Sequence, residues 1–198
     1  KLLSGIRAGK GTRTETDAPV QKFGLVILVQ FKGENEIFTY KKDDFINLLM
    51  QEGYSEYGAE GSVKEYFDDQ FKGQYEFVFE VSDIVTLDKE MAFYGGNDND
   101  GQDRNPHLMV MEACELVDND IDFRKFDQDG DGEVDNVFVF FAGKDEAEGA
   151  SEDHIWSHAW YIKDGAGRSL VLDGVTINRY ACASELTTQD ANTTVMTS

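Results

Sequence analysis

Two continuous apolar runs dominate the hydrophobic pattern of this chain, one at residues 23–31 and one at 136–142. Runs of this length, rich in β-branched and aromatic residues, are typical of strands buried on both faces of a sheet. A third segment, from Tyr75 to Val81, alternates aromatic or apolar residues with Glu76, Val78 and Glu80. Alternation with a period of two predicts a half-buried strand.

Helical spacing appears between these runs. Phe45, Leu48 and Leu49 recur on one helical face, and Gly53 can end that helix in a left-handed cap. Ser62 and Glu65 form a capping box, in which each side chain satisfies the backbone of the other residue. The helix that follows should bury the apolar face made by Val63, Tyr66, Phe67 and Phe71.

Asn105 and Pro106 predict the start of a further helix, with Asn as the cap and Pro in the first turn. It should run to about Val117 and bury Leu108, Met111 and Cys114, with Ala113 or Val117 as further candidates. Near the end of the chain, Asp173-Gly174 separates the segments 170–172 and 175–180, which is a strong signal for a β-hairpin.

The order of these elements predicts an α/β (α+β) fold, with a mixed, twisted sheet and helices packed on it. Residues 1–21 are polar, locally basic and without apolar periodicity, so we interpret them as a leader or linker, or the end of a pro-segment. Residues 22–198 should form one α/β domain.

The net charge of the chain limits the classes of molecule that it is expected to bind. The 198 residues contain 39 Asp and Glu against 18 Lys and Arg, for a formal net charge of −21. A field of this sign repels nucleic acid and anionic lipid surfaces and attracts cations. No apolar run reaches the length of about 18 residues that a membrane span needs.

The most specific motif is the acidic loop at residues 127–135. Asp127, Asp129 and Asp131 occupy positions one, three and five, and Gly132 at position six permits a sharp turn. Glu133 would supply a backbone carbonyl, and Asp135 could complete the shell directly or through water. Calcium accepts such irregular oxygen sets, so we predict calcium bound by the residues Asp127, Asp129, Asp131, Glu133 and Asp135.

This loop differs from an EF-hand. Position twelve is Phe138, which offers no carboxylate, and the residues that follow form a strand. The motif therefore indicates a structural calcium clip, and the alternative is a solvated acidic turn. A second acidic loop, residues 98–103, resembles half a site and reads better as a flexible polar loop.

The chain has three histidines and two cysteines. His154 and His158 are four residues apart, but no Glu follows His154 and the flanking residues suit a strand, so a structural or cleft-lining role is favoured over a zinc pair. Cys114 and Cys182 lie in apolar stretches and read as buried thiols, with a disulfide between them as the alternative.

Several stretches in order resemble the immune inhibitor A-like zinc metallopeptidases of bacteria. They span about residues 23–186 and are Val26 to Phe31, Gly61 to Phe67, Gly73 to Tyr75, Met111 to Cys114, the acidic loop leading into Val137, Ile155 to His158, Leu172 to Gly174, and Tyr180 to Leu186. The resemblance implies a secreted, zinc-dependent endopeptidase with a zincin-like fold, whose N-terminal subdomain this chain would supply.

In such a fold, an extended peptide or protein substrate pairs with an edge strand. By position, the segment from Val175 to Tyr180 would be that strand, with Thr176, Asn178, Tyr180 and His158 as substrate-binding residues. An ordinary hairpin strand is the alternative. The zinc-binding helix of the family would follow Leu186, but the sequence contains no H-E-x-x-H motif, so we expect the chain to stop short of the zinc ligands and to be inactive by itself.

Two further interpretations compete with the peptidase. A non-catalytic, calcium-binding interaction module could retain the same scaffold. The residues that follow Ser198 would separate the two, because an H-E-x-x-H helix there supports the enzyme and its absence supports the module. A carbohydrate-active enzyme could use paired carboxylates, but no spacing in this sequence singles out such a pair.

Overall fold

The computed structural model describes residues 18–33 and 36–186. Five strands form a mixed sheet in the order β2-β1-β3-β7-β4, and the first four of these are parallel to one another while β4 runs antiparallel to β7. This confirms the predicted α/β class with a mixed sheet. The strands are β1 (Val20–Gln30), β2 (Tyr75–Thr86), β3 (Val137–Lys144), β4 (His158–Tyr161) and β7 (Arg179–Leu186).

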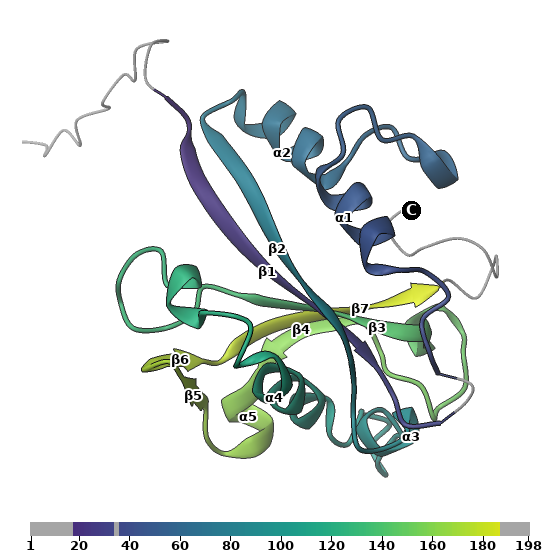
Figure 1. The fold of residues 1–198 in the computed structure, drawn as a ribbon. Coiled ribbons are helices and arrows are strands. Elements are labelled where there is room, and N and C mark those ends of the chain that lie inside the picture. Colours follow the sequence, from purple (N-terminus) through teal and green to yellow (C-terminus); the bar gives the residue numbers. More distant parts are fainter. Residues whose placement is uncertain (1–17, 34–35, 187–198) are drawn as a thin grey trace, which may run out of the picture.

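The two apolar runs are the central strands of this sheet. In β1, Leu25, Ile27 and Val29 face one core while Val26 and Leu28 face another. β3 divides its side chains in the same way. The prediction that both runs are buried on two faces is confirmed, and Figure 1 shows β1 and β2 crossing steeply over β3 and β7, as the twist of a sheet requires.

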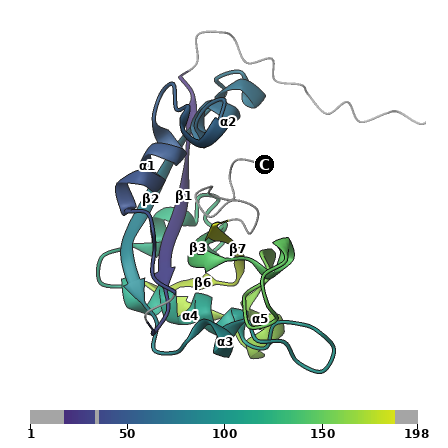
Figure 2. The ribbon, with the colours of Figure 1, turned by 90° about the vertical axis from the view of Figure 1, so that its right-hand side faces the viewer.

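Helices cover both faces of the sheet (Figures 1 and 2). The α1 face carries α1 (Lys42–Met50) and α2 (Val63–Phe71), and the α4 face carries α3 (Met91–Tyr94), α4 (Pro106–Val117) and α5 (Ile162–Ala166). Short 3₁₀ turns and the hairpin complete the described chain: η1 (Glu56–Gly58), η2 (Phe123–Phe126), η3 (Glu146–Glu148), β5 (Leu170–Leu172) and β6 (Val175–Ile177).

Helix α2 confirms its predicted cap but not its predicted burial. Ser62 accepts a hydrogen bond from the Glu65 backbone and Glu65 reciprocates, as a capping box requires. None of the apolar residues in the helix is buried, and Tyr66 is 60% exposed. The reason is that the first part of β1 pairs only with β2, so this ribbon lacks a second layer and α2 merely stacks Phe67 on Phe77.

Helix α4 is buried more extensively than its spacing predicted. Pro106 occupies its first turn as expected, but the Asn105 side chain does not cap the helix and donates instead to the Phe93 carbonyl at 2.8 Å. Leu108 is only half-buried. The buried side chains are Met109, Val110, Met111, Ala113, Cys114 and Val117.

Both cysteines are free and buried, which confirms the interpretation as inert thiols and shows the disulfide alternative to be wrong. Burial raises the pKa of Cys182 to about 12, so its thiol stays protonated at neutral pH. Among residues 18–33 and 36–186, the structure contains no helix with the length and apolar character needed to cross a bilayer.

Glu185 is a fully buried carboxylate near the end of β7. One of its oxygens accepts the backbone N–H groups of Thr39 and Tyr40, both at 2.6 Å, and the other faces the N–H of Gly143 at 3.4 Å. Burial raises the pKa of Glu185, and these N–H donors oppose the rise. The side chain therefore joins β7 and β3 to the segment that leads into α1.

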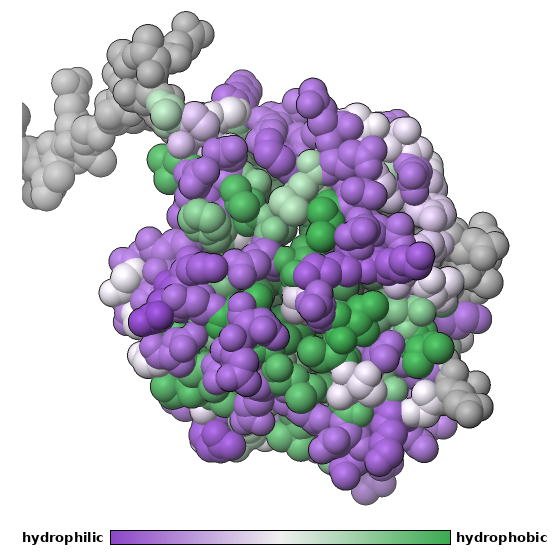
Figure 3. All heavy atoms as spheres, viewed as in Figure 1, coloured by the Kyte–Doolittle hydropathy of each residue, from purple (hydrophilic) through white to green (hydrophobic). Residues whose placement is uncertain are grey.

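The surface of the described residues is not uniformly polar. Figure 3 shows hydrophobic residues reaching the surface across the middle and lower part of the view, where α3 and α4 lie in Figure 1, beneath a more hydrophilic upper part. Exposed apolar residues on these helices include Phe93 and Leu116. Isolated exposures of this kind are common on soluble domains.

Candidate functional site

The acidic loop lies between η2 and β3, at the entrance to a central strand. Gly130 and Gly132 adopt φ values of 76° and 88°, which side chains with a Cβ rarely tolerate. The backbone turns at these two glycines fold the loop back on itself. As a result, Asp127, Asp129 and Asp131 each offer a carboxylate oxygen within 4.8 Å of the other two.

Backbone N–H groups organise these carboxylates. Asp127 accepts from the N–H groups of Gly130 at 2.9 Å and Gly132 at 3.0 Å, and Asp131 accepts from Glu133 at 2.8 Å. Asp135 is turned toward Gln128, whose side-chain amide donates to it at 2.9 Å. The loop brings three of the five predicted ligands together. An all-oxygen group of this kind fits a hard cation such as calcium.

The acidic loop is tied to the sheet through Gln128. Its side-chain amide accepts from the backbone N–H of Phe23 at 2.9 Å and donates to the Phe23 carbonyl at 3.0 Å. Asp135 N–H also donates to the Phe126 carbonyl at 2.9 Å. The loop therefore connects β1 with the start of β3.

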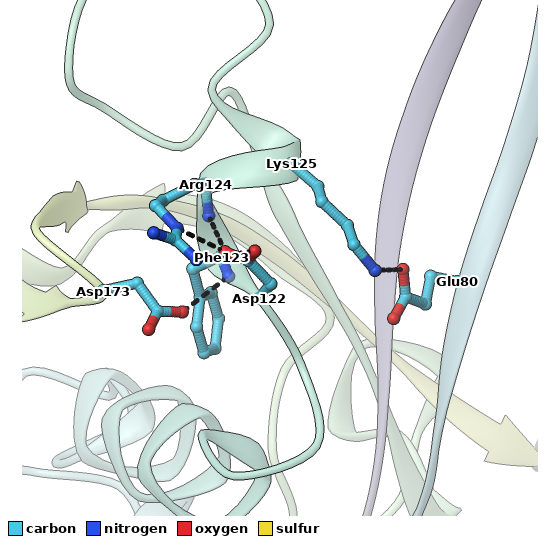
Figure 4. Close-up of polar contacts among 6 residues, drawn as sticks. All are labelled: Glu80, Asp122, Phe123, Arg124, Lys125 and Asp173. Carbon is cyan, nitrogen blue, oxygen red and sulfur yellow. Dashed lines mark hydrogen bonds and ion pairs between the residues drawn. The ribbon is translucent and has the colours of Figure 1, made fainter.

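A second set of contacts ties the acidic loop to the β5–β6 hairpin. Thr176 donates its N–H to Gly132 and accepts from Val134, both at 2.8 Å. Figure 4 shows the neighbouring turn, where Asp173 accepts the N–H of Phe123 at 2.9 Å and Lys125 pairs with Glu80 of β2. In the same turn, Asp122 accepts hydrogen bonds from the backbone and guanidinium of Arg124.

The antiparallel edge of the main sheet is β4, and not the segment from Val175 to Tyr180 as predicted. That segment divides at Asn178. Its first part is β6 of the separate hairpin, and its last residues begin β7, which lies between β3 and β4. The hairpin around Asp173-Gly174 is confirmed.

The structure brings together two of the four residues predicted to bind substrate. The His158 ring nitrogen Nε2 lies 2.7 Å from the Tyr180 hydroxyl, and His158 Nδ1 lies 2.6 Å from the Trp156 carbonyl. Burial raises the pKa of Tyr180, so its phenol stays protonated. Cys182 lies beside them, with its sulfur 3.5 Å from His158 Nδ1.

The other two residues lie apart from this pair. The backbone of Thr176 is hydrogen-bonded to the acidic loop, as described above. Asn178 accepts from α5, with its backbone carbonyl bound to Ile162 N–H at 2.8 Å and its side-chain oxygen to Lys163 N–H at 3.0 Å. Both residues connect elements of the described chain.

Next to His158 and Tyr180 lies a cleft of about 600 Å³. His158 and Trp160 sit opposite Cys182 and Tyr180 in the β4–β7 register, and these two belong to the core under α4, so the cleft lies on the α4 face. Its other walls come from four separate segments. The lining residues are Gly101, Gln102, Asp103, Arg104, Pro106, His107, Glu146, Trp156, His158, Trp160, Asp164, Gly165 and Tyr180.

Sequence reasoning missed most residues of this cleft. Asp103 was assigned to a flexible polar loop, yet its carboxylate accepts the Trp156 N–H at 3.1 Å, and burial raises its pKa to about 7. Glu146 and Asp145 add to that rise through repulsion between like charges. The two exposed tryptophans, Trp156 and Trp160, were the available signal, because large aromatic side chains at a surface often mark binding sites.

Among the described residues, Asp127, Asp129 and Asp131 form the one group of three metal-ligating side chains close enough to share an ion. Catalytic zinc sites use mainly imidazole and carboxylate ligands with an open position, and this all-carboxylate turn does not provide that set. His154 lies in a loop and His158 in β4, where its ring nitrogens contact Tyr180 and Trp156. The described residues therefore do not fit a catalytic zinc.

These features define an α/β domain with an acidic turn and an antiparallel sheet edge. The profile of the immune inhibitor A peptidase M6 catalytic domain matches residues 28–195, most of the chain. The chain belongs to this family, which is a family of metallopeptidases. A comparison with curated proteins found no match.

Proposed function

We propose that the chain is the sheet-bearing part of the catalytic domain of a secreted, zinc-dependent endopeptidase. The family match carries this proposal, and the sheet supports it. The antiparallel strand β4 lies at one end of the otherwise parallel sheet, and its outer edge pairs with no other described strand. An edge of this kind can receive a substrate peptide as an additional strand.

In this proposal, the peptide backbone bonds to the main chain of β4 (His158–Tyr161). Main-chain pairing holds an extended substrate with little dependence on its sequence, which suits a peptidase of broad specificity. His158 and Tyr180 stand beside the bound peptide, and their mutual hydrogen bond fixes the orientation of the imidazole. Thr176 and Asn178 act indirectly, by holding the hairpin and α5 in place.

Zinc, when bound in an enzyme of this class, lowers the pKa of a water molecule and polarises the scissile carbonyl. The described residues do not supply its ligands, so no catalytic step is assigned to them. We infer that this chain positions the substrate and that the zinc ligands are supplied elsewhere in the enzyme.

Calcium is the second metal of the proposal. The convergence of Asp127, Asp129 and Asp131 supports it, because three ionised carboxylates so close together repel one another until a cation neutralises them. Since the turn also bonds to β1 and to the β5–β6 hairpin, the bound ion would stabilise the sheet beyond the loop itself. Glu133 and Asp135 complete the proposed ligand set.

Secretion belongs to the same proposal and rests on the family and on the acidic composition, with a net charge of −21. The rival function is a calcium-binding interaction module without catalysis. It is favoured by one observation, namely that the three histidines of the chain are at positions 107, 154 and 158 and form no H-E-x-x-H motif.

The edge-strand proposal is tested by hydrogen exchange. We expect an unstructured peptide, such as a casein fragment, to slow amide exchange in β4 while exchange in β2, at the opposite edge, is unchanged. The same peptide with N-methylated backbone amides is the matched control, because it loses donors that strand pairing needs. Equal protection by both peptides, or protection at β2 alone, would contradict the proposal.

A further inference from the structure

The cleft on the α4 face carries an excess of negative charge. Asp103, Glu146 and Asp164 line it, against one guanidinium from Arg104. The Arg104 Nη2 atom donates to the Asn97 carbonyl at 2.6 Å, so this guanidinium already has a hydrogen-bond partner outside the carboxylates of the cleft. Burial lowers the pKa of His107, which keeps its imidazole neutral at pH 7.

Two residues that line the cleft, Asp103 and Glu146, each keep one carboxylate oxygen without a hydrogen-bond partner among the described residues. Asp103 uses Oδ2 for the Trp156 N–H, and Glu146 uses Oε1 for the Asn97 amide at 2.8 Å. The second oxygen of each, Asp103 Oδ1 and Glu146 Oε2, is buried and has no hydrogen-bond partner among the described residues. Buried acceptors without donors are costly, and a cationic donor removes that cost.

Aromatic walls complete the cleft. Trp156 and Trp160 are 52% and 56% exposed, and both line it. An indole face attracts a guanidinium more effectively than the rings of Tyr or Phe do, and the flat guanidinium stacks on it while its edge donates to carboxylates. A bare divalent ion would gain nothing from the indoles, and these carboxylates do not converge as those of Asp127, Asp129 and Asp131 do.

We propose that this cleft binds the side chain of an arginine in a peptide, between the indoles of Trp156 and Trp160 and against the carboxylates of Asp103 and Glu146. A volume of about 600 Å³ is within the usual range of ligand sites and accommodates the side chain with part of its backbone. A peptide lying along β4 would direct alternate side chains to this face. This inference rests on the proposed function in one respect only, namely that the peptide reaches the cleft by lying along β4.

The chain itself provides the probe for the experiment. Its two tryptophans are Trp156 and Trp160, so intrinsic tryptophan fluorescence reports on the cleft alone. The peptide acetyl-Ala-Arg-Ala-amide should produce a saturable change in emission. The same peptide with citrulline, which has the shape of arginine without its charge, should bind at least about tenfold more weakly, the loss expected for one charge-assisted contact.

Variants locate the binding. Glu146→Gln should weaken arginine binding by about tenfold, whereas Glu115→Gln, an equal charge change on the exposed side of α4, should leave it unchanged. Trp160→Phe keeps an aromatic wall and should weaken binding less than Trp160→Ala. Circular dichroism of each variant separates a lost contact from a lost fold.

Several results would overturn the inference. One is equal affinity for the arginine and citrulline peptides. Another is a fluorescence response to calcium chloride in a variant with Asp129→Asn and Asp131→Asn, since that would make the cleft a metal site. Slowed exchange in β4 with a neutral peptide, but no response to the arginine peptide, would reject the cleft while leaving the proposed function intact.

Discussion

At the scale of single residues, Asp103 shows how burial changes an ordinary side chain. Loss of water around its carboxyl and, to a smaller extent, the nearby carboxylates of Glu146 and Asp145 raise its pKa to about 7, while the Trp156 N–H opposes the shift. The groups around it therefore set the pH at which the cleft becomes fully anionic. Arginine should bind more tightly once that carboxyl is ionised.

The same residue gives a prediction about stability. The folded Asp103 holds its proton up to about pH 7, whereas the unfolded residue loses it near its ordinary value of 3.8. Its contribution is therefore fully present below about pH 4 and is lost as the pH rises through 7. Asp103→Asn should remove this loss. The difference in free energy of unfolding, variant minus parent, should therefore increase between pH 5 and pH 8.

Urea denaturation at pH 5, 6, 7 and 8 measures the effect. Asp120→Asn, at an exposed position beyond the end of α4, is the matched control and should keep the pH dependence of the parent. Curves for parent and Asp103→Asn that stay parallel across this range would show that the carboxyl titrates normally.

At the scale of elements, the acidic loop is where sequence and structure agree most closely. Asp127, Asp129 and Asp131 converge as their spacing predicted, because alternate positions in a glycine-rich turn point to one side. The attachment of the loop to Phe23 and Thr176 could not be predicted, since both partners are far away in the sequence. Local sequence patterns therefore predict the turn, whereas its contacts with distant residues depend on how the chain packs.

Calcium should raise the melting temperature of the chain. At a free concentration one hundred times the dissociation constant, the ion stabilises the folded state by about 2.7 kcal/mol, which corresponds to a shift of several degrees. The double variant with Asp129→Asn and Asp131→Asn should lose this shift. Scanning calorimetry with and without calcium chloride measures it.

The control is a double variant with Glu115→Gln and Asp120→Asn, which removes the same charge from exposed positions elsewhere. It should retain the shift in melting temperature. If both double variants respond to calcium as the parent does, the ion binds outside the acidic loop.

The elements that sequence reasoning misplaced share a physical cause. Helix α2 has an apolar face, but its neighbour is a two-stranded ribbon with no second layer, so Tyr66 stays exposed. The edge strand was assigned to 175–180 by the position of that segment in the family resemblance. The break at Asn178, whose side chain bonds to α5, depends on contacts that no local pattern contains.

At the scale of the whole molecule, the fold class followed from two buried strands, but the cleft did not. β1 and β3 were recognisable because both faces of each are apolar, which a sheet covered by helices on both sides requires. The cleft draws its walls from segments around residues 103, 146, 158, 164 and 180. Only the assembled chain places them together.

The described chain should not hydrolyse protein by itself. Its sequence has three histidines and no pair arranged for zinc, so adding zinc and calcium to the 198-residue protein should leave casein intact. A characterised zinc endopeptidase in the same buffer serves as the positive control. Casein cleavage by the chain that stops on adding 1,10-phenanthroline would show that it binds a catalytic metal after all.

The hydrogen bonds of the buried Glu185 carboxylate link distant parts of the chain. One Glu185 oxygen accepts from the backbone at Thr39 and Tyr40 and the other faces Gly143, so the end of β7 is tied to two other segments of the chain. Thr39 and Tyr40 lie about 145 positions before Glu185 in the sequence. A substitution in the segment ahead of α1 should therefore weaken the attachment of β7, although the two are far apart along the chain.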